Sequence, residues 1–391
     1  MPPRIVWRGL VCGRVDPAGN RIDGKGAPTV VDGSRFVGLD VHARESACAV
    51  VDLASGEVIQ RRVRGRPRRV LEFLECEVAR PWRAVYEAGP TGYGLARAAA
   101  ERGLDVAVCA PGHIPRQPGD RVKTDTRDAL KLARLLAAGQ LKLVRIPDPR
   151  DEWLRDLVRC REDARIDLMR ARHRLSKFCL RRDLYFPGPG RAWTARHRDW
   201  LAGLRFDDRA SELAFVDYLH AHDALLARRD RLDAALAELA GSCQQAPLIA
   251  RLRCLRGIDT LSATGLACEV PFAAFAKPQK VSAFVGLVPS ETSSGARRRQ
   301  GTITRAGSKH ARRLLVEAAW HYRRPPRVAK DVRARQAGQD PAAIETAWRA
   351  QQRLHARWQH LEGERGKRST TVAVAVAREL AAFCWELAHQ T

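Results

Sequence analysis

Residues 36–63, FVGLDVHARESACAVVDLASGEVIQRRV, contain three short apolar runs that are separated by turn-forming residues. Phe36–Val41 and Ser46–Leu53 are rich in the β-branched and small apolar residues that are typical of strands. Residues 54–57, ASGE, form a turn signal that leads into the third run, Val58–Val63. The segment therefore predicts a β-meander.

Helix and strand signals alternate after this meander. Val70–Val78 and Gly94–Gly103 have helical patterns, whereas Trp82–Tyr86 and Asp105–Cys109 read as buried strands. Such alternation is typical of a layered fold in which helices cover a sheet. We therefore expect an α/β domain over residues 35–150.

The rest of the chain is predicted to be mainly helical. Residues 151–245 carry leucines at helical spacing among many arginines, with a breaker, FPGPG, at 186–190. This stripe fits either core packing in a helical pair or a partner-binding coiled coil. Residues 246–325 form a compact unit with glycines and basic residues, and 326–391 a helical tail. A flexible leader, residues 1–34, precedes these regions.

The charge of the 391-residue chain is strongly positive, because 69 Lys and Arg face 44 Asp and Glu, a net +25. This excess favours a polyanionic partner, DNA or RNA, since phosphate contacts dominate such binding. Codon bias in a high-GC genome is the alternative, but it should raise Asp and Glu as well.

The apolar patterning and the cysteines indicate a cytoplasmic protein. No apolar stretch approaches the roughly 20 residues of a membrane span, and no secretory signal opens the chain. The ten cysteines include no CxxC motif, so we expect reduced thiols and neither a disulfide framework nor a zinc site.

Acidic residues lie at the ends of two predicted strands. Asp40 ends the run 36–41, and Glu87 follows the run 82–86. A carboxylate in a buried strand is costly unless it is paired, hydrogen-bonded or bound to a metal. Each acid alone also fits a turn cap, so the pair on neighbouring strands is the informative observation.

Two further acids, Asp125 and Asp128, lie in the segment KTDTRDA at 123–129. Asp125 fits a helix N-cap, and the helix dipole would favour the negative charge of Asp128 in the first turn. The spacing also places both acids on one side of a first helical turn. Four converging carboxylates would repel one another unless divalent cations neutralised them, and oxygen ligands favour Mg²⁺, with Mn²⁺ as the alternative. The order of the four acids is similar to that of RuvC/RNase H-like nucleases.

The third unit combines a hydroxyl-rich segment with basic residues. Residues 255–266 look like a helix-hairpin-helix, whose turn either offers N–H groups to a phosphate or simply connects two helices. Ser293 and Ser294 precede Gly295 in what reads as a solvated loop or as the source of a nucleophilic hydroxyl. The residues that we expect to contact nucleic acid are Arg297, Arg298, Arg299, Arg305, Lys309, Arg312 and Arg313.

Together these segments resemble the IS110 group of insertion-sequence transposases, which is also known for recombination guided by a bridge RNA. The resemblance rests on five stretches spread over about residues 35–325, and their joint occurrence is far more specific than any single motif. They are Gly38–His42, Tyr86–Gly92, Lys123–Ala129, Trp193–Leu204 and Gly286–Ala319.

The resemblance implies a RuvC-like DEDD domain, a helical linker that mediates protomer contacts, and a C-terminal transposase domain. It implies that Asp40, Glu87, Asp125 and Asp128 bind Mg²⁺. It also implies that Ser294, directly before the glycine, is the nucleophile that becomes linked to DNA, with the adjacent Ser293 as the reserve choice.

The partners implied by the resemblance are donor DNA, target DNA and a noncoding bridge RNA that pairs with both. The protein would form a homo-oligomer, either a dimer or a tetramer, in which each active site combines domains of different protomers. It would be associated with the nucleoid. Base pairing would then supply the sequence specificity, as in other RNA-guided systems.

Two other classes of function fit parts of the pattern. A RuvC-like junction resolvase or nuclease would use the metal-binding acids alone and keep the serine unit as a DNA clamp. A non-enzymatic nucleic-acid-binding protein would depend only on the positive charge, and alanine at the four acids would leave it unaffected.

Overall fold

The computed structural model describes residues 35–115, 124–188, 190, 192–294 and 297–390. The predicted leader, residues 1–34, lies outside these ranges. The chain divides into two compact units, residues 1–147 and 148–391, which are described separately below.

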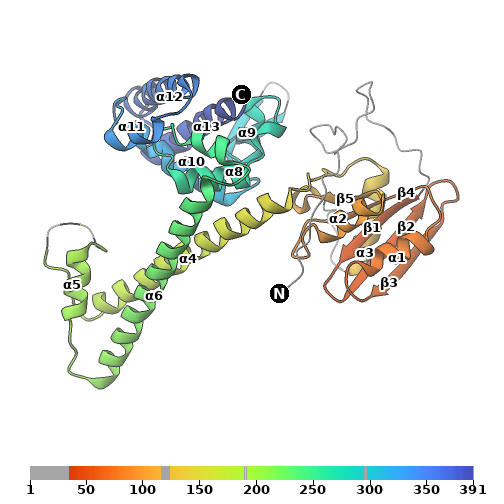
Figure 1. The fold of residues 1–391 in the computed structure, drawn as a ribbon, viewed down its shortest axis with the longest axis horizontal. Coiled ribbons are helices and arrows are strands. Elements are labelled where there is room, and N and C mark those ends of the chain that lie inside the picture. Colours follow the sequence, from red (N-terminus) through yellow and green to blue (C-terminus); the bar gives the residue numbers. More distant parts are fainter. Residues whose placement is uncertain (1–34, 116–123, 189, 191, 295–296, 391) are drawn as a thin grey trace. The chain divides into compact units, whose positions relative to one another are not determined.

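The N-terminal unit is built on a mixed five-stranded sheet with the order β3-β2-β1-β4-β5 (Figure 1). The first three strands form the antiparallel meander expected from the sequence, whereas β4 runs parallel to β1 and β5 runs parallel to β4. The strands are β1 (Arg35–Val41), β2 (Glu45–Asp52), β3 (Val58–Arg64), β4 (Trp82–Glu87) and β5 (Val106–Cys109). The predicted α/β domain is confirmed.

Helices cover both faces of this sheet. On one face, α1 (Arg69–Cys76) and α2 (Gly94–Glu101) pack on apolar side chains that include Leu39 and Tyr86. On the other face lies α3 (Asp125–Ala137), and its Leu132 and Leu136 pack on Val85 and Cys109. A short 3-10 turn, η1 (Pro111–His113), follows β5. The helix α3 therefore covers the face of the sheet opposite to the one covered by α1 and α2.

The C-terminal unit begins with two long helices, α4 (Pro149–Leu180) and α6 (Arg209–Ala240). They pack against each other, and the guanidinium of Arg161 on α4 donates to the carboxylate of Asp233 on α6 at 2.5 Å. The short helix α5 (Ala195–Gly203) adds Leu201 to a small core with residues of both long helices. These helices confirm that the region after the sheet domain is helical, while its role in protomer contacts remains a prediction.

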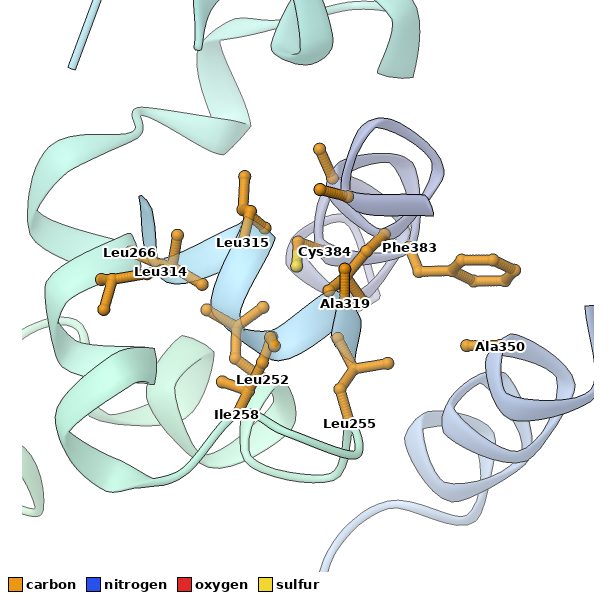
Figure 2. Packing of buried hydrophobic residues seen from close by; sticks show 14 of the residues in the cluster. Leu252, Leu255, Ile258, Leu266, Leu314, Leu315, Ala319, Ala350, Phe383 and Cys384 are labelled. Carbon is orange, nitrogen blue, oxygen red and sulfur yellow. The ribbon is translucent and has the colours of Figure 1, made fainter. Parts of the chain in front are cut away.

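The remaining elements share one large core (Figure 2). Leu252, Ile258 and Leu315 lie in it together with Ala350 and Cys384, all fully buried. The sequence pattern separated 246–325 from a helical tail at 326–391, but here both segments build the same core. The helices that contribute to it are α7 (Ala246–Leu252), α8 (Thr260–Glu269), α9 (Pro278–Phe284), α10 (Lys309–Ala319), α12 (Pro341–Gln359) and α13 (Ser369–Ala388). The helix α11 (Lys330–Gln336) is tied to this unit by a hydrogen bond from Nε2 of Gln336 to the carbonyl of Cys254 at 3.1 Å.

Short turns and one hairpin complete this unit. Two of these are 3-10 turns, η2 (Phe272–Ala274) and η3 (Trp320–Arg323), and the third is a single π-helical turn, η4 (His360–Glu364). The hairpin pairs β6 (Pro289–Ser294) with β7 (Arg297–Ile303) in antiparallel register. Its strands consist mostly of Ser, Thr and Arg, so they lack the apolar alternation by which strands are recognised. The residues around Ser293 and Ser294 therefore resembled a solvated loop in the sequence, but they belong to a hairpin.

Candidate active site

Asp40 and Glu87 occupy equivalent positions on two adjacent parallel strands. Leu39 of β1 pairs with Tyr86 of β4, so Asp40 and Glu87 come next along each strand. Leu39 and Tyr86 are fully buried on the α1 and α2 face. Because successive side chains of a strand alternate between faces, Asp40 and Glu87 lie on the face that carries α3.

The helix α3 begins with the other two predicted acids. Thr124 is its N-cap and accepts a hydrogen bond from the backbone N–H of Arg127 at 3.4 Å. The interpretation of Asp125 as an N-cap is therefore wrong, because Asp125 is the first residue of the helix itself. Asp125 and Asp128 both lie in the first turn, where the positive end of the helix dipole favours carboxylates.

The structure brings Asp40 together with Asp125 and a histidine. Nε2 of His42 lies 3.4 Å from Oδ1 of Asp40 and 3.9 Å from Oδ1 of Asp125. Burial raises the pKa of Asp40, the charge of His42 lowers it, and the negative charges of Asp125 and Asp128 raise it. The charge of Asp128 thus also affects the pKa of Asp40. The strand register places Glu87 at the same edge of the sheet.

The donor set fits a divalent cation. One ligand atom from each of Asp40, His42 and Asp125 lies within 4.8 Å of the others. Half-buried carboxylates that repel one another favour a bound cation, which neutralises them, and oxygen donors suit Mg²⁺ and Mn²⁺. His42 ends the stretch Gly38–His42, but the sequence alone predicted no role for it, because only the fold brings its imidazole to Asp125.

The candidate serine lies at the end of the β6–β7 hairpin. Ser294 is the last residue of β6 and pairs in register with Arg297. The hydroxyl of the reserve residue, Ser293, donates to the carboxylate of Glu291 at 2.8 Å. The side chains of Ser294, Arg297 and Arg298 lie outside the described part of the structure.

The predicted nucleic-acid contacts divide into two groups. Arg299, Arg305 and Lys309 are exposed. Arg312 instead donates from one guanidinium nitrogen to the carbonyls of Val285 and Ala306, both at 2.8 Å, so it ties α10 to the preceding segment.

Arg313 is held by acidic side chains. It contacts Glu162 of α4 at 2.7 Å and Glu317 of α10 at 2.5 Å. Glu162 lies 151 residues away in the sequence, so no local pattern indicated this pairing. Both Arg312 and Arg313 therefore have structural partners within this unit.

The segment that resembled a helix-hairpin-helix, residues 255–266, forms the turn that follows α7 and the first part of α8. Gly257 in the turn has φ of +82°, and a Cβ there would lie 2.7 Å from the carbonyl oxygen of Ala318. The turn thus packs closely on α10. A phosphate-binding role for it stays a prediction.

Two family comparisons match most of the elements that position these residues. Residues 37–184 match a DEDD transposase profile of the IS110 type, described as "Transposase", and residues 249–333 match the "Transposase IS116/IS110/IS902 family". A putative transposase, y4qE, of Sinorhizobium fredii is 38% identical over 99% of this chain and 96% of its own length. The chain belongs to the IS110 family of insertion-sequence transposases. A second relative, the transposase for insertion sequence element IS1533 of Leptospira borgpetersenii, is 34% identical over 85% of this chain and 98% of its own length.

Family membership defines the chemistry at a coarse level. As an IS110-family transposase the chain is an enzyme of DNA transposition, and its DEDD-type domain indicates the use of a divalent metal. The DEDD match spans all four candidate acids, and the second match spans the β6–β7 hairpin and α10. Within the described residues, no helix combines the length and apolar character needed to cross a bilayer.

Proposed function

We propose that this IS110-family transposase cuts and rejoins DNA strands with one composite active site. Asp40, Glu87, Asp125 and Asp128 hold Mg²⁺, or alternatively Mn²⁺, and Ser294 is the nucleophile. The observation that carries the proposal is that ligand atoms of Asp40 and Asp125 lie within 4.8 Å of each other, with Asp128 in the same first turn of α3. The sheet domain, residues 35–150, is then RuvC/RNase H-like, and 151–245 is the helical linker.

Each group has a defined task in this scheme. The carboxylates hold the cation on the α3 face of the sheet. A bound divalent cation activates an oxygen nucleophile and stabilises the leaving oxygen of a phosphodiester. Oγ of Ser294 attacks phosphorus, so that an Oγ–P bond forms while a P–O bond of the strand breaks, and the serine proton ends on the leaving oxygen.

The partners follow from the charge and from the family. The exposed residues Arg299, Arg305 and Lys309 contact phosphates of donor and target DNA, in line with the net charge of +25. A noncoding bridge RNA pairs with both DNAs and supplies specificity. A homo-oligomer, dimer or tetramer, brings the serine unit of one protomer to the acids of another, with the long helices α4 and α6 as the contact region.

The test is recombination in vitro with the element's RNA, both DNA substrates and Mg²⁺, together with a denaturing gel that detects a covalent protein–DNA adduct. We expect Ser294→Ala to abolish both adduct and recombination, and Asp125→Ala to abolish recombination. Ser293→Ala is the matched control, because it removes a neighbouring hydroxyl of the same hairpin. Unimpaired recombination by Ser294→Ala or Asp125→Ala would overturn the assigned roles, and strand cleavage without an adduct would favour a metal-only nuclease.

A further inference from the structure

His42 is fixed at the same edge of the sheet as the candidate acids. It follows β1 directly, and its backbone N–H donates to the carbonyl of Glu45 at 3.2 Å, which closes the turn into β2. The Glu45 side chain is in turn bound by Arg62 of β3 at 2.8 Å. The backbone that carries the imidazole is therefore anchored in the hairpin.

We propose that His42 is a nitrogen ligand of the cation held by Asp40 and Asp125, and that it shifts the preference of the site from Mg²⁺ toward Mn²⁺. This inference rests on the metal-binding role proposed above for the acids. It adds a donor of a different chemical type to a site that the four carboxylates would otherwise make all-oxygen.

The distances suit shared coordination of one ion. Two donor atoms that each lie about 2.1 Å from an octahedral ion are about 3.0 Å apart at adjacent positions and about 4.2 Å apart at opposite ones. The separations from Nε2 of His42 are 3.4 Å to Asp40 and 3.9 Å to Asp125, between these limits. Small side-chain rotations are enough to bring these separations to the ideal values. Such rotations are possible because 57% of the His42 side chain and 50% of the Asp125 side chain are exposed.

The chemical consequence follows from ligand type. Carboxylate and water ligands suit Mg²⁺, Ca²⁺ and Mn²⁺, whereas imidazole favours transition metals. Mn²⁺ accepts both donor types, so an imidazole beside carboxylates raises its affinity relative to that of Mg²⁺.

A competing role for His42 makes the opposite prediction. If the imidazole only acted as a positive counter-ion to Asp40, it would occupy the place of the metal. Its removal would then increase the affinity for every divalent cation. If it is a ligand, its removal lowers the affinity for Mn²⁺ more than that for Mg²⁺.

The experiment uses the untagged full chain and Mn²⁺ as the probe. Binding is measured by the loss of the free Mn²⁺ EPR signal, and Mg²⁺ affinity by competition. Pulsed EPR of the bound ion reports whether a ¹⁴N nucleus is coordinated. We expect a ¹⁴N modulation in the parent chain that His42→Ala removes. We also expect a loss of Mn²⁺ affinity of roughly tenfold or more, because removing even a group that is hydrogen-bonded to a metal ligand causes a loss on this scale.

Two variants make the result specific. His173→Ala removes an exposed imidazole from α4 and should leave both Mn²⁺ affinity and the ¹⁴N signal unchanged. His42→Gln replaces the nitrogen donor with an amide oxygen, so the Mn²⁺ to Mg²⁺ affinity ratio should fall while part of the total binding is retained.

Asp125→Asn separates this inference from the function on which it rests. If Asp125→Asn weakens Mn²⁺ binding but His42→Ala keeps the affinity and the ¹⁴N signal, or raises the affinity, the role of His42 is wrong and the acidic site stands. If Asp125→Asn leaves Mn²⁺ binding intact, the acidic site itself is wrong, and the inference on His42 fails with it.

Discussion

Gly38 of β1 lies directly against the backbone of α3, and a Cβ at this position would be 1.9 Å from the carbonyl oxygen of Ala129. Ala47 and Ala49 of β2 line the same contact with Ala129. Small side chains on both sides let the helix approach the sheet closely. Because α3 begins at Asp125 and β1 carries Asp40, this close approach sets the separation of the two carboxylates.

The first prediction concerns this contact. Gly38→Ala forces α3 away from the sheet, and overpacking of this kind costs about 1–3 kcal/mol or more. We expect a lower Tm and weaker Mn²⁺ binding, because Asp40 and Asp125 separate. Gly94→Ala in α2 is the matched control, since a Cβ there meets nothing within 4 Å. An unchanged Tm in Gly38→Ala would contradict the packing described here.

The second prediction separates two basic residues of α10. Arg312→Ala removes the hydrogen bonds to Val285 and Ala306 and should destabilise the C-terminal unit by about 2 kcal/mol. Lys309→Ala should leave Tm unchanged but lower the slope of log affinity against log salt by about 1, as expected for one lost phosphate contact. Thermal unfolding and DNA binding at several salt concentrations measure the two effects. Equal loss of stability in both variants would contradict the distinction.

The third prediction concerns the partly buried carboxylate of Glu162, whose side chain is 14% exposed. Burial raises its pKa, but a hydrogen bond from Arg165 and the charges of Arg313 and Arg165 outweigh this effect, so the pKa lies below its usual range. A lowered pKa means that the ionised pair stabilises the fold above the unfolded-state pKa and loses this effect as pH falls through the folded-state value. Glu162→Gln should lower the free energy of unfolding by about 3 kcal/mol at neutral pH.

The measurement for Glu162 is the free energy of unfolding from neutral to acidic pH. The difference between Glu162→Gln and the parent chain should shrink on acidification. Asp167→Asn, on the same helix, breaks exposed ion pairs with Arg170 and Arg228 and should lower the free energy of unfolding by less than about 1 kcal/mol. A difference that grows with acidification would contradict the assigned charge state.

The fourth prediction concerns His222, which is fully buried and stacks on Trp193 with ring centroids 5.0 Å apart. Nε of Arg172 donates to its Nε2 at 3.5 Å, so Nε2 accepts and Nδ1 carries the proton toward Asp223 at 3.0 Å. Burial lowers the pKa of His222, Asp223 raises it, and Arg172 lowers it, with a net decrease from 6.5. The neutral ring therefore stabilises the fold above pH 6.5.

Stability should consequently fall as pH decreases from 6.5 through the folded-state pKa of His222. Tryptophan fluorescence during denaturant unfolding at several pH values measures this change. His222→Gln should flatten the pH dependence, whereas His220→Gln, which alters an exposed residue of the same helix, should not. Stability that rises on acidification would show that the charged ring is favoured.

The sheet domain could be predicted because its signals are local. Phe36–Val41 and Val58–Val63 are short apolar runs with flanking turn residues, and the acids at strand ends stood out against apolar neighbours. The position of Asp125 in the first turn of a helix was also within reach, although its N-cap assignment failed because Thr124 competes for that place.

Other parts depended on contacts that no local pattern encodes. His42 and Asp125 meet across a separation of 83 positions in the sequence, and Arg313 and Glu162 across an even longer one. The strands that carry Ser294 and Arg299 are polar on both faces, so their pairing left no periodic signal. The segment 326–391 was predicted as a separate helical tail, because an apolar stripe shows that a helix is packed but not which core it packs into.

The shared core of the C-terminal unit also sets an order of events during synthesis. Val376, Leu380 and Cys384 of α13 are fully buried in it, so the core cannot close before α13 has left the ribosome. The sheet and α3 are complete by residue 137, and domains fold as units in the order of their emergence. The sheet and its acidic cluster can therefore form well before the core that supports the β6–β7 hairpin closes.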